Sequence, residues 1–326
     1  YSDPGFLILY GGMLTLGLSQ GLVEGVINPL CATLYPDQTT HKLNVLHAWW
    51  PGGLIVGGLV AVMITQTMGL DREGLSASLA TLGWQTKLGA ILIPAVAYAF
   101  LILGQEFPET ERVTAGVSNR EMLKGVFHPM FLFWFALMWM TAATELAPDQ
   151  WVGSVITALT NMQGILILVY TAGIMFVLRF FGGPLAHKFS PIGLLILSSI
   201  LSAIGLFWLG AVRTPLEAFA AATIFGVGKT FFWPVMLGVT SERFPRTGAL
   251  GLAIIGGTGN LSVAFVLPLM GRWYDQYGAS AAFQYVAVLP VILTFAFAGL
   301  FVYYRAMGGY RPVDIKPTAA PGSGAG

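Results

Sequence analysis

Apolar stretches long enough to cross a lipid bilayer recur along almost the whole chain. A helix of about 20 apolar residues spans the hydrocarbon core. Because lipid offers no hydrogen-bond partners, each stretch must satisfy its backbone internally, so successive stretches fold as a bundle of helices. The sequence predicts an all-α membrane protein with nine spans, at residues 6–34, 44–68, 88–104, 130–147, 162–182, 191–212, 215–239, 248–271 and 280–304.

The low charge content agrees with this class. Of 326 residues, 56% are hydrophobic and 10% are charged, whereas a soluble domain typically carries about a quarter charged residues. The net charge of +1 and the lack of a basic run give no indication of a nucleic-acid partner. The single cysteine, Cys31, excludes an internal disulfide. Together with four histidines, mostly at span ends, it offers no nucleophile–base pair or metal set, so we expect no enzyme, no cofactor and no metal site.

One long polar interval divides the chain. Residues 105–129 predict a cytoplasmic linker with a short surface helix. Residues 1–104 before it form a partial N-terminal helix bundle of three spans, and residues 130–305 after it form a C-terminal six-helix bundle. The remaining residues, 306–326, end in KPTAAPGSGAG and predict a disordered tail.

Lysine and arginine in the loops predict the orientation of the chain. If the linker is cytoplasmic, eleven of these residues, Arg179 among them, gather on that face and four on the other. Since cytoplasmic loops are rich in Lys and Arg, the linker and the C-terminus lie inside and Tyr1 outside. The chain opens without a methionine or an export signal, so we expect the natural protein to begin upstream.

A stripe of small residues lies in the first span. Gly17, Gly21 and Gly25 recur every four residues. Small residues at this spacing let a neighbouring helix approach closely in lipid. The stripe therefore permits close packing of another helix.

A polar stripe lies beside the glycines in the same span. Gln20, Glu24 and Asn28 also recur every four residues. A carboxylate at this depth costs several kcal/mol unless it faces a partner, a wet cavity or a proton. The stripe indicates either a pathway residue at Glu24 or a structural acid capped by a neighbouring helix. Asn28 is followed by Pro29, which removes a backbone donor and can kink the span.

Charged residues inside the spans recur in every third span. Glu24 lies in the first span, Glu145 in the fourth with Asp149 near its outer end, and Lys229 in the seventh. This recurrence indicates a three-helix repeat folded around a common cavity. Lys229 is interpreted as a cavity cation, paired with Glu24 or Glu145 or facing an anionic substrate group; the alternative is snorkelling to an interface.

The fourth span carries a second polar cluster. Glu145, Asp149, Gln150 and Trp151 surround Pro148, which is expected to loosen the helix and free backbone carbonyls as ligands. The alternative is a wet outer helix end. In the eighth span, Asn260 follows closely spaced glycines and is a further candidate for the cavity.

Two aromatic residues lie at helical spacing from polar ones. Trp50 follows His47 by three residues, and Trp233 follows Lys229 by four, so each pair is expected to share a helix face. Such faces suit a sugar-like ring, although tryptophans also anchor spans at membrane interfaces. His47 is either a proton relay or a packing residue at a helix end.

The segment GVGKT at residues 226–230 resembles part of a P-loop. A P-loop requires a glycine five residues before Gly228, where this chain has Thr223, and a preceding strand. The surroundings are an apolar helix. Nucleotide binding is therefore rejected.

Several motifs together resemble the major facilitator superfamily, and within it the fucose–proton symporter-like sugar porters. Gly21–Leu30 is similar to the G-L-x-E-x-x-x-N-P pattern of the fourth helix in that group, and Lys42-Leu43-Asn44 to the R-L-N that opens the fifth. Further matches lie in Met140–Trp151, Leu178-Arg179-Phe180, Gly183–Pro191, Phe225–Pro245 and Gly256–Asp275.

The resemblance covers essentially all spans and implies the fold and setting. It implies that helices four to twelve of an expected twelve are present, in a multi-pass protein of the bacterial inner membrane. In this family the first helix carries an acidic coupling residue, which lies outside this sequence. The chain departs from the pattern at Trp50, which aligns with an asparagine that handles substrate and proton, and at Lys229, which has no counterpart among sugar porters generally.

The resulting hypothesis is a secondary active transporter, monomeric in the bilayer, that moves a small polar solute such as a sugar together with a proton. Glu24 is the first candidate for the coupling carboxylate and Glu145 the second. A sodium-coupled porter, an uncoupled facilitator or an exporter remains open, as do, more remotely, an enzyme or a sensor. The candidate substrate-binding residues are Gln20, Asn28, His47, Trp50, Gln150, Trp151, Lys229, Trp233 and Asn260.

Overall fold

The computed structural model describes residues 4–70, 72 and 74–313, which contain helices and no strand. The α-helices and the two short 3-10 helices, η1 and η2, follow one another in this order: α1 (Pro4–Leu34), η1 (Pro36–Gln38), α2 (Thr39–Met68), α3 (Ala77–Gly89), α4 (Leu92–Ile102), α5 (Glu111–Thr114), α6 (Asn119–Val126), α7 (Pro129–Thr160), α8 (Ile165–Arg179), α9 (Gly182–Phe189), α10 (Pro191–Leu209), α11 (Pro215–Lys229), α12 (Phe232–Arg243), η2 (Pro245–Thr247), α13 (Gly248–Tyr277), α14 (Ala279–Val286) and α15 (Val288–Ala306).

Eight helical segments of the described chain are long and apolar enough to cross a membrane. A ninth apolar helix, α8, has only 15 residues, which is short for a full span. The all-α membrane fold is thus confirmed, and each predicted span corresponds to one of these nine. The eight long segments are Gly5–Leu34, Pro36–Met68, Ala77–Ile102, Pro129–Thr160, Pro191–Leu209, Pro215–Arg243, Pro245–Tyr277 and Ala279–Ala306.

The fourth span is longer than predicted. Helix α7 runs through Pro148 to Thr160 instead of ending near residue 147. A proline removes one backbone hydrogen bond but is tolerated in a membrane helix when neighbours support it, and Pro148 is buried. Asp149 therefore lies within the helix, and its predicted place near the outer end is wrong.

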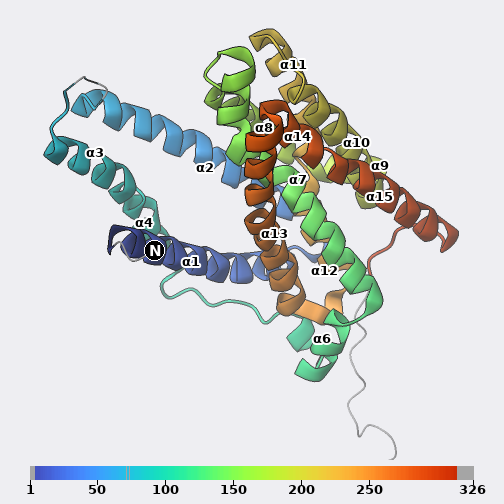
Figure 1. Cartoon of the computed structure of the whole chain (residues 1–326). Helices are drawn as coiled ribbons and strands as arrows, with labels where there is room; N and C mark the ends of the chain where they lie inside the picture. The colour runs from blue at the N-terminus through green and yellow to red at the C-terminus, as the bar shows by residue number, and fades with distance from the viewer. Residues whose placement is uncertain (1–3, 71, 73, 314–326) are drawn as a thin grey trace, which may run out of the picture.

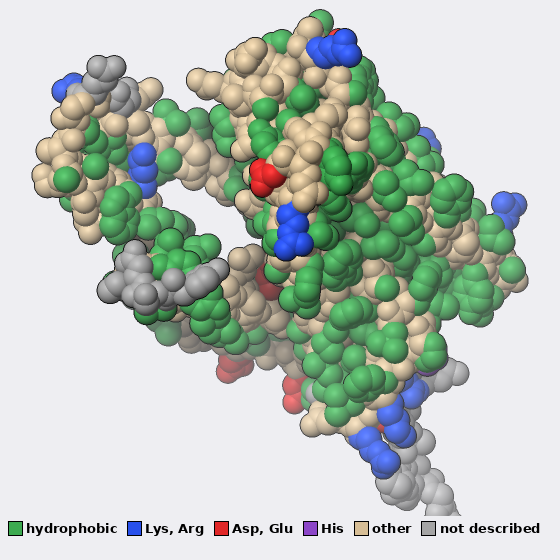
Figure 2. All heavy atoms as spheres, viewed as in Figure 1, with side chains coloured by type: hydrophobic (Ala, Val, Ile, Leu, Met, Phe, Trp, Pro, Cys, Tyr) green, Lys and Arg blue, Asp and Glu red, His purple; other side chains and the backbone are tan. Residues whose placement is uncertain are grey.

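The helices from α7 onward pack around one another, while α1 to α4 flank them on one side (Figure 1). Helix α1 packs on α13, and α2 packs on α8 and α12. Helix α3 packs on α2 and leads into α4, and α3, α4 and the second half of α2 form an extended arm beside the other helices (Figure 1). Figure 2 shows hydrophobic side chains covering much of this extended arm.

The tightest helix pair is α10 with α11. A Cβ atom added at Gly205 would lie 2.5 Å from the backbone nitrogen of Phe225, and one at Gly228 would lie 2.5 Å from that of Ser202. Only glycine permits such an approach of two helix backbones. The glycines of the rejected nucleotide motif thus serve helix packing.

The glycine stripe of α1 has no such partner. A Cβ at Gly17, Gly21 or Gly25 would meet no heavy atom within 4 Å among the described residues. No described helix makes the close approach that this stripe permits. Helix α1 instead approaches α13 through its polar stripe, since a Cβ at Gly256 would lie 3.7 Å from Oε2 of Glu24.

The interval between the two groups of spans contains α5 and α6. Helix α6 begins with a capping box in which Ser118 and Glu121 bond each other's backbone nitrogens. The Ser118 backbone N–H and hydroxyl donate to the Glu121 carboxylate, which lowers the pKa of that exposed group.

The first part of the predicted tail is ordered. Tyr310 donates a hydrogen bond to Oε2 of Glu242 at 2.5 Å, and the Val313 nitrogen donates to the Glu242 carbonyl at 2.7 Å. Disorder was predicted from residue 306, and it is wrong up to Val313 because these bonds hold the chain against α12. The rest of that tail, residues 314–326, lies outside the described residues.

Candidate functional site

One pocket opens where α1, α2, α7, α8, α12 and α13 meet. Its volume is about 280 Å³, and every charged side chain in its wall comes from the middle or end of an apolar helix. Three elements that are far apart in sequence thus supply charges to a single space. The lining residues are Gln20, Glu24, His47, Trp50, Glu145, Leu146, Asp149, Gln150, Arg179, Trp233, Asn260 and Val263.

Glu145 is held by two partners at the pocket wall. Its Oε1 accepts a hydrogen bond from Nη2 of Arg179 at 2.6 Å, and its Oε2 accepts one from the Trp233 backbone nitrogen at 3.1 Å. The two charged side chains are each 2% exposed. A cation and a backbone N–H as partners offset part of the cost of burying a carboxylate.

Arg179 also supplies hydrogen bonds that prolines have removed. Its Nε donates to the Thr230 carbonyl and its Nη1 to the His47 carbonyl, each at 2.8 Å. In a regular helix these carbonyls would accept from the residues four positions on, which are Pro234 and Pro51. Proline has no N–H, so both acceptors would otherwise be unpaired. One guanidinium therefore ties α8 to α2, to α7 and to the break between α11 and α12.

Lys229 is paired with Asp149. The lysine ends α11, its side chain is 0% exposed, and its Nζ bonds Oδ1 of Asp149. Its pairing with Glu24 or Glu145 was predicted and is wrong, as is snorkelling to an interface. Lys229 does not share a helix face with Trp233, because the helix breaks at Thr230 and Phe231 between them.

His47 lies inside α2 and not at a helix end. Its Nε2 lies 2.9 Å from Oδ1 of Asn28 in α1, and both residues are buried. The amide oxygen can only accept, so Nε2 carries the proton of this bond. Asn28 thereby fixes the imidazole ring, and Pro29 follows it inside the continuous helix α1.

Glu24 has fewer partners than Glu145. The side-chain bond recorded for it is a long one of 3.4 Å from Nε2 of Gln20. Both residues face the pocket, and Gln20 is exposed. Glu24 is thus a half-buried carboxylate that is accessible from the pocket.

Aromatic and amide groups complete the wall. Trp50 is 41% exposed, whereas Trp233 is 6% exposed and packs over Gly259, where a Cβ would lie 2.5 Å from its ring. The amide nitrogen of Asn260 bonds the Gly256 carbonyl at 3.4 Å and so stays on the pocket side of α13. Gln150 lines the pocket from α7.

The structure does not bring every candidate into the wall. Asn28 and Lys229 lie behind it, bonded to His47 and Asp149, and Trp151 packs on Tyr274 with ring centroids 5.4 Å apart. Sequence reasoning counted Arg179 among the cytoplasmic loop charges, which is wrong because it is buried in the wall. Its place at the end of an apolar helix, in the segment Leu178-Arg179-Phe180, was the available signal. The described residues contain no cluster of side chains suited to a metal ion.

The class that this architecture defines is the major facilitator fold. The crystal structure of a major facilitator superfamily transporter, FucP, in the outward conformation matches with a TM-score of 0.65 and 19% identity, over 85% of this chain and 72% of that one. The E. coli fucose:proton symporter FucP, in a variant form, matches with a TM-score of 0.67 and 18% identity, over 85% and 73%. At this identity the likeness establishes the fold. No family model and no curated protein matches the sequence.

Proposed function

We propose that the protein is a secondary active transporter that carries a small polar solute, a sugar or a related compound, together with a proton. The observation that carries the proposal is the pocket itself, in which Glu24 and the Glu145–Arg179 pair meet inside a bundle of apolar helices. Ionisable groups at such depth are costly and mark pathways for substrates or protons. The similar solved structure is described as a fucose:proton symporter.

Glu24 is the better candidate for the coupling acid. Its neighbour Gln20 can hydrogen-bond either the charged or the protonated carboxyl. Glu145 is held by hydrogen bonds from Arg179 and the Trp233 nitrogen, so a proton on the oxygen that faces Arg179 would disrupt the shorter of these contacts. Proton exchange at Glu24 requires no such rearrangement. Glu145 then acts by holding the wall of the pocket.

The lining suits a small hydroxylated ring. A volume of about 280 Å³ is at the lower end of ligand pockets, which run from about 300 to 1,000 Å³. Trp50 and Trp233 offer apolar faces, and Gln20, Gln150 and Asn260 offer both donors and acceptors. This combination provides stacking and hydrogen bonds for a sugar without demanding a charge on it.

The proposed setting is a plasma membrane with the linker and the C-terminal segment on the cytoplasmic side. Excluding the buried Arg179 leaves ten Lys or Arg residues on that face against four on the other. Such an excess is typical of cytoplasmic loops.

The test is the change Glu24→Gln in the natural protein reconstituted in liposomes. The amide keeps the shape of the acid and mimics its protonated form. We expect uphill sugar uptake driven by an imposed pH gradient to be lost, while counterflow exchange of labelled sugar continues. Coupling requires that proton affinity and substrate affinity depend on each other. Uphill uptake at the unmodified rate would remove Glu24 from the coupling role, and loss of exchange would make it a substrate ligand.

A further inference from the structure

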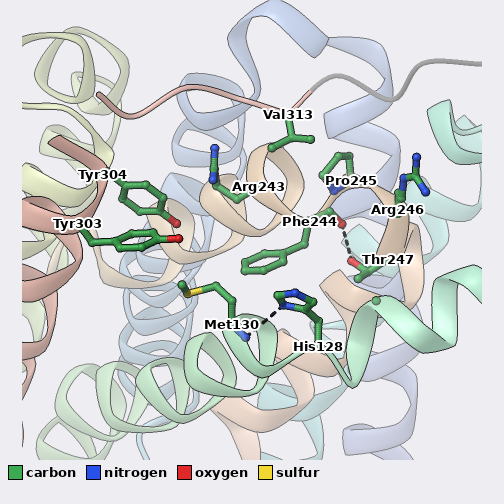
Figure 3. A pocket seen from close by; sticks show the side chains of 11 residues that line it. His128, Met130, Arg243, Phe244, Pro245, Arg246, Thr247, Tyr303, Tyr304 and Val313 are labelled. Atoms are coloured by element: carbon green, nitrogen blue, oxygen red, sulfur yellow. Dashed lines mark hydrogen bonds between the residues drawn. The ribbon is translucent and has the colours of Figure 1, made fainter. Parts of the chain in front are cut away.

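A second pocket lies beside α6, apart from the pocket lined by Glu24 and Glu145. It has a volume of about 300 Å³ and lies where α7 begins, η2 turns and α15 ends (Figure 3). Arg243, Arg246 and His128 contribute nitrogen donors to its wall, and Tyr303 and Tyr304 contribute hydroxyl groups. No acidic side chain is among its described lining residues.

Among the described residues, neither Arg243 nor Arg246 forms an ion pair with a carboxylate within 4 Å. Glu242, which precedes Arg243 in α12, accepts hydrogen bonds from Thr40 at 2.6 Å and from Tyr310 at 2.5 Å. Glu121, bonded to Ser118 in the capping box of α6, interacts electrostatically with Arg246 without direct contact. The two arginines therefore have no carboxylate in direct contact, and the space beside them can receive an anion.

The donors are oriented by contacts within the protein. Nη1 of Arg243 bonds the Arg311 carbonyl at 2.6 Å, and its guanidinium lies 4.8 Å from the centroid of the Tyr304 ring. Nδ1 of His128 accepts from the Met130 nitrogen at 3.2 Å, so in the neutral ring Nε2 carries the proton and is a donor. In Figure 3 both tyrosine hydroxyls point towards the space between Met130 and Arg243. These groups are arranged to receive an acceptor-only ligand.

An exposed apolar track leads along the bundle to the same pocket. On α15, Ile292, Phe295 and Val302 are 46%, 75% and 67% exposed, and they recur on one face that ends at Tyr303. Helix α15 crosses the membrane by its length and composition. The track is therefore at the depth of lipid acyl chains, and the cationic pocket is at the level of the headgroups.

We propose that this pocket binds the phosphate of an anionic phospholipid, with an acyl chain lying along the exposed face of α15. Arg243 and Arg246 bind the phosphate charge, and the hydroxyl of Tyr303 donates to one of its oxygens. Basic pockets between helix ends on the cytoplasmic side are suited to acidic headgroups. Met130 and Phe244 line the pocket beside these donors and accommodate an apolar part of the lipid.

Native mass spectrometry of the detergent-purified natural protein tests the proposal. The titrants are phosphatidylglycerol, phosphatidylcholine with the same acyl chains, and inorganic phosphate. We expect phosphatidylglycerol to bind more tightly than phosphatidylcholine, and Arg246→Gln to weaken its binding about fivefold, the effect of one cation near a membrane surface. Tyr303→Phe, which keeps the ring, weakens it further when combined with Arg246→Gln.

The matched control is Arg305→Gln, which removes an exposed arginine of α15 that does not line the pocket. Equal losses in Arg246→Gln and Arg305→Gln would overturn the proposal, because binding would then reflect surface charge alone. Equal binding of the two lipids would also overturn it. If inorganic phosphate displaced phosphatidylglycerol at similar concentrations, the pocket would be a site for small anions and the assignment to lipid would be wrong.

Discussion

Arg179 at the end of α8 and Glu145 in the middle of α7 form an ion pair of 2.6 Å in which both side chains are 2% exposed. The remaining nitrogens of Arg179 bond two carbonyls for which Pro51 and Pro234 cannot provide donors. A single side chain thus satisfies two carbonyls left without a helical donor and pairs with one acid. The pocket lined by Glu24 and Glu145 depends on this contact for its shape.

We expect Arg179→Gln to destabilise the protein by about 3–5 kcal/mol. The change leaves the buried Glu145 charge without its cation, and removing one partner of a buried pair typically costs this much. Thermal unfolding in detergent measures the loss. The double change Arg179→Met with Glu145→Leu removes both charges and is expected to recover part of it. A control is Arg213→Gln, at an exposed position in the connection between α10 and α11; if it and Arg179→Gln behave alike, the pair has no structural role.

Lys229→Met is expected to reduce substrate uptake at least tenfold, an effect of about 1.4 kcal/mol or more. It leaves Asp149 unpaired at the pocket wall, where the loose carboxylate competes for the groups that bind substrate. Adding Asp149→Asn removes that charge and should restore protein yield and part of the uptake. Uptake into liposomes, normalised to the amount of reconstituted protein, measures the loss in the single variant and the recovery in the double variant. Lys124→Met, in exposed α6, serves as the control, and normal uptake in Lys229→Met would separate the pair from transport.

How far the sequence predicts this architecture differs from one part to another. The apolar runs predict the helices, because lipid leaves a chain no other way to satisfy its backbone. The polar stripe of α1 correctly indicates that Glu24 faces inward in the structure, since a bare carboxylate cannot face lipid at low cost. The same reasoning predicts where the charged residues lie along each helix, but it does not predict which of them form ion pairs with each other.

The two ion pairs cannot be predicted from the sequence, because each joins residues that are far apart along the chain. Arg179 and Glu145 are 34 positions apart, and Lys229 and Asp149 are 80 apart, so neither spacing follows a helical period. The break between α11 and α12 was also missed. Pro234 was part of the sequence, yet proline predicts only a lost hydrogen bond, and Pro148 loses the same bond within a continuous α7. Whether the helix continues or breaks depends on the group that bonds the freed carbonyl, and that group is supplied by the tertiary structure.

Gly205→Ala is expected to cost about 1–3 kcal/mol of stability, the usual effect of overpacking. The added Cβ would lie 2.5 Å from the Phe225 nitrogen, and a backbone cannot move aside as a flexible side chain can. The control is Gly153→Ala in α7, where a Cβ meets nothing within 4 Å among the described residues. There alanine should be neutral or stabilising by up to about 1 kcal/mol. The measurement is the unfolding temperature of each variant. Equal unfolding temperatures for Gly205→Ala and Gly153→Ala would contradict the close packing of α10 on α11.

Tyr310 gives the protein a pH-dependent contact at the end of the bundle. Its hydroxyl donates to Glu242, whose other oxygen accepts from Thr40 of α2, so the C-terminal segment, α12 and α2 are joined. Burial, and then the charge of Glu242, raise the pKa of Tyr310 well above its usual value of 10. A raised folded-state pKa means that this contact is fully stabilising below pH 10 and is lost as pH rises through the higher folded value.

Comparison with Tyr310→Phe measures this contribution, because the variant lacks both the hydrogen bond and the titrating group. At pH 8 the unmodified protein should be more stable by about 1.5–3 kcal/mol, as for other hydrogen bonds to charged groups. Above pH 10 the difference should fall by about 1.4 kcal/mol per pH unit, since only the unfolded chain ionises there. Thermal unfolding from pH 8 to 11 follows this, with Tyr277→Phe, at an exposed tyrosine, as control. A pH-independent difference would show that Tyr310 ionises equally in both states and that its bond to Glu242 does not hold the segment in place.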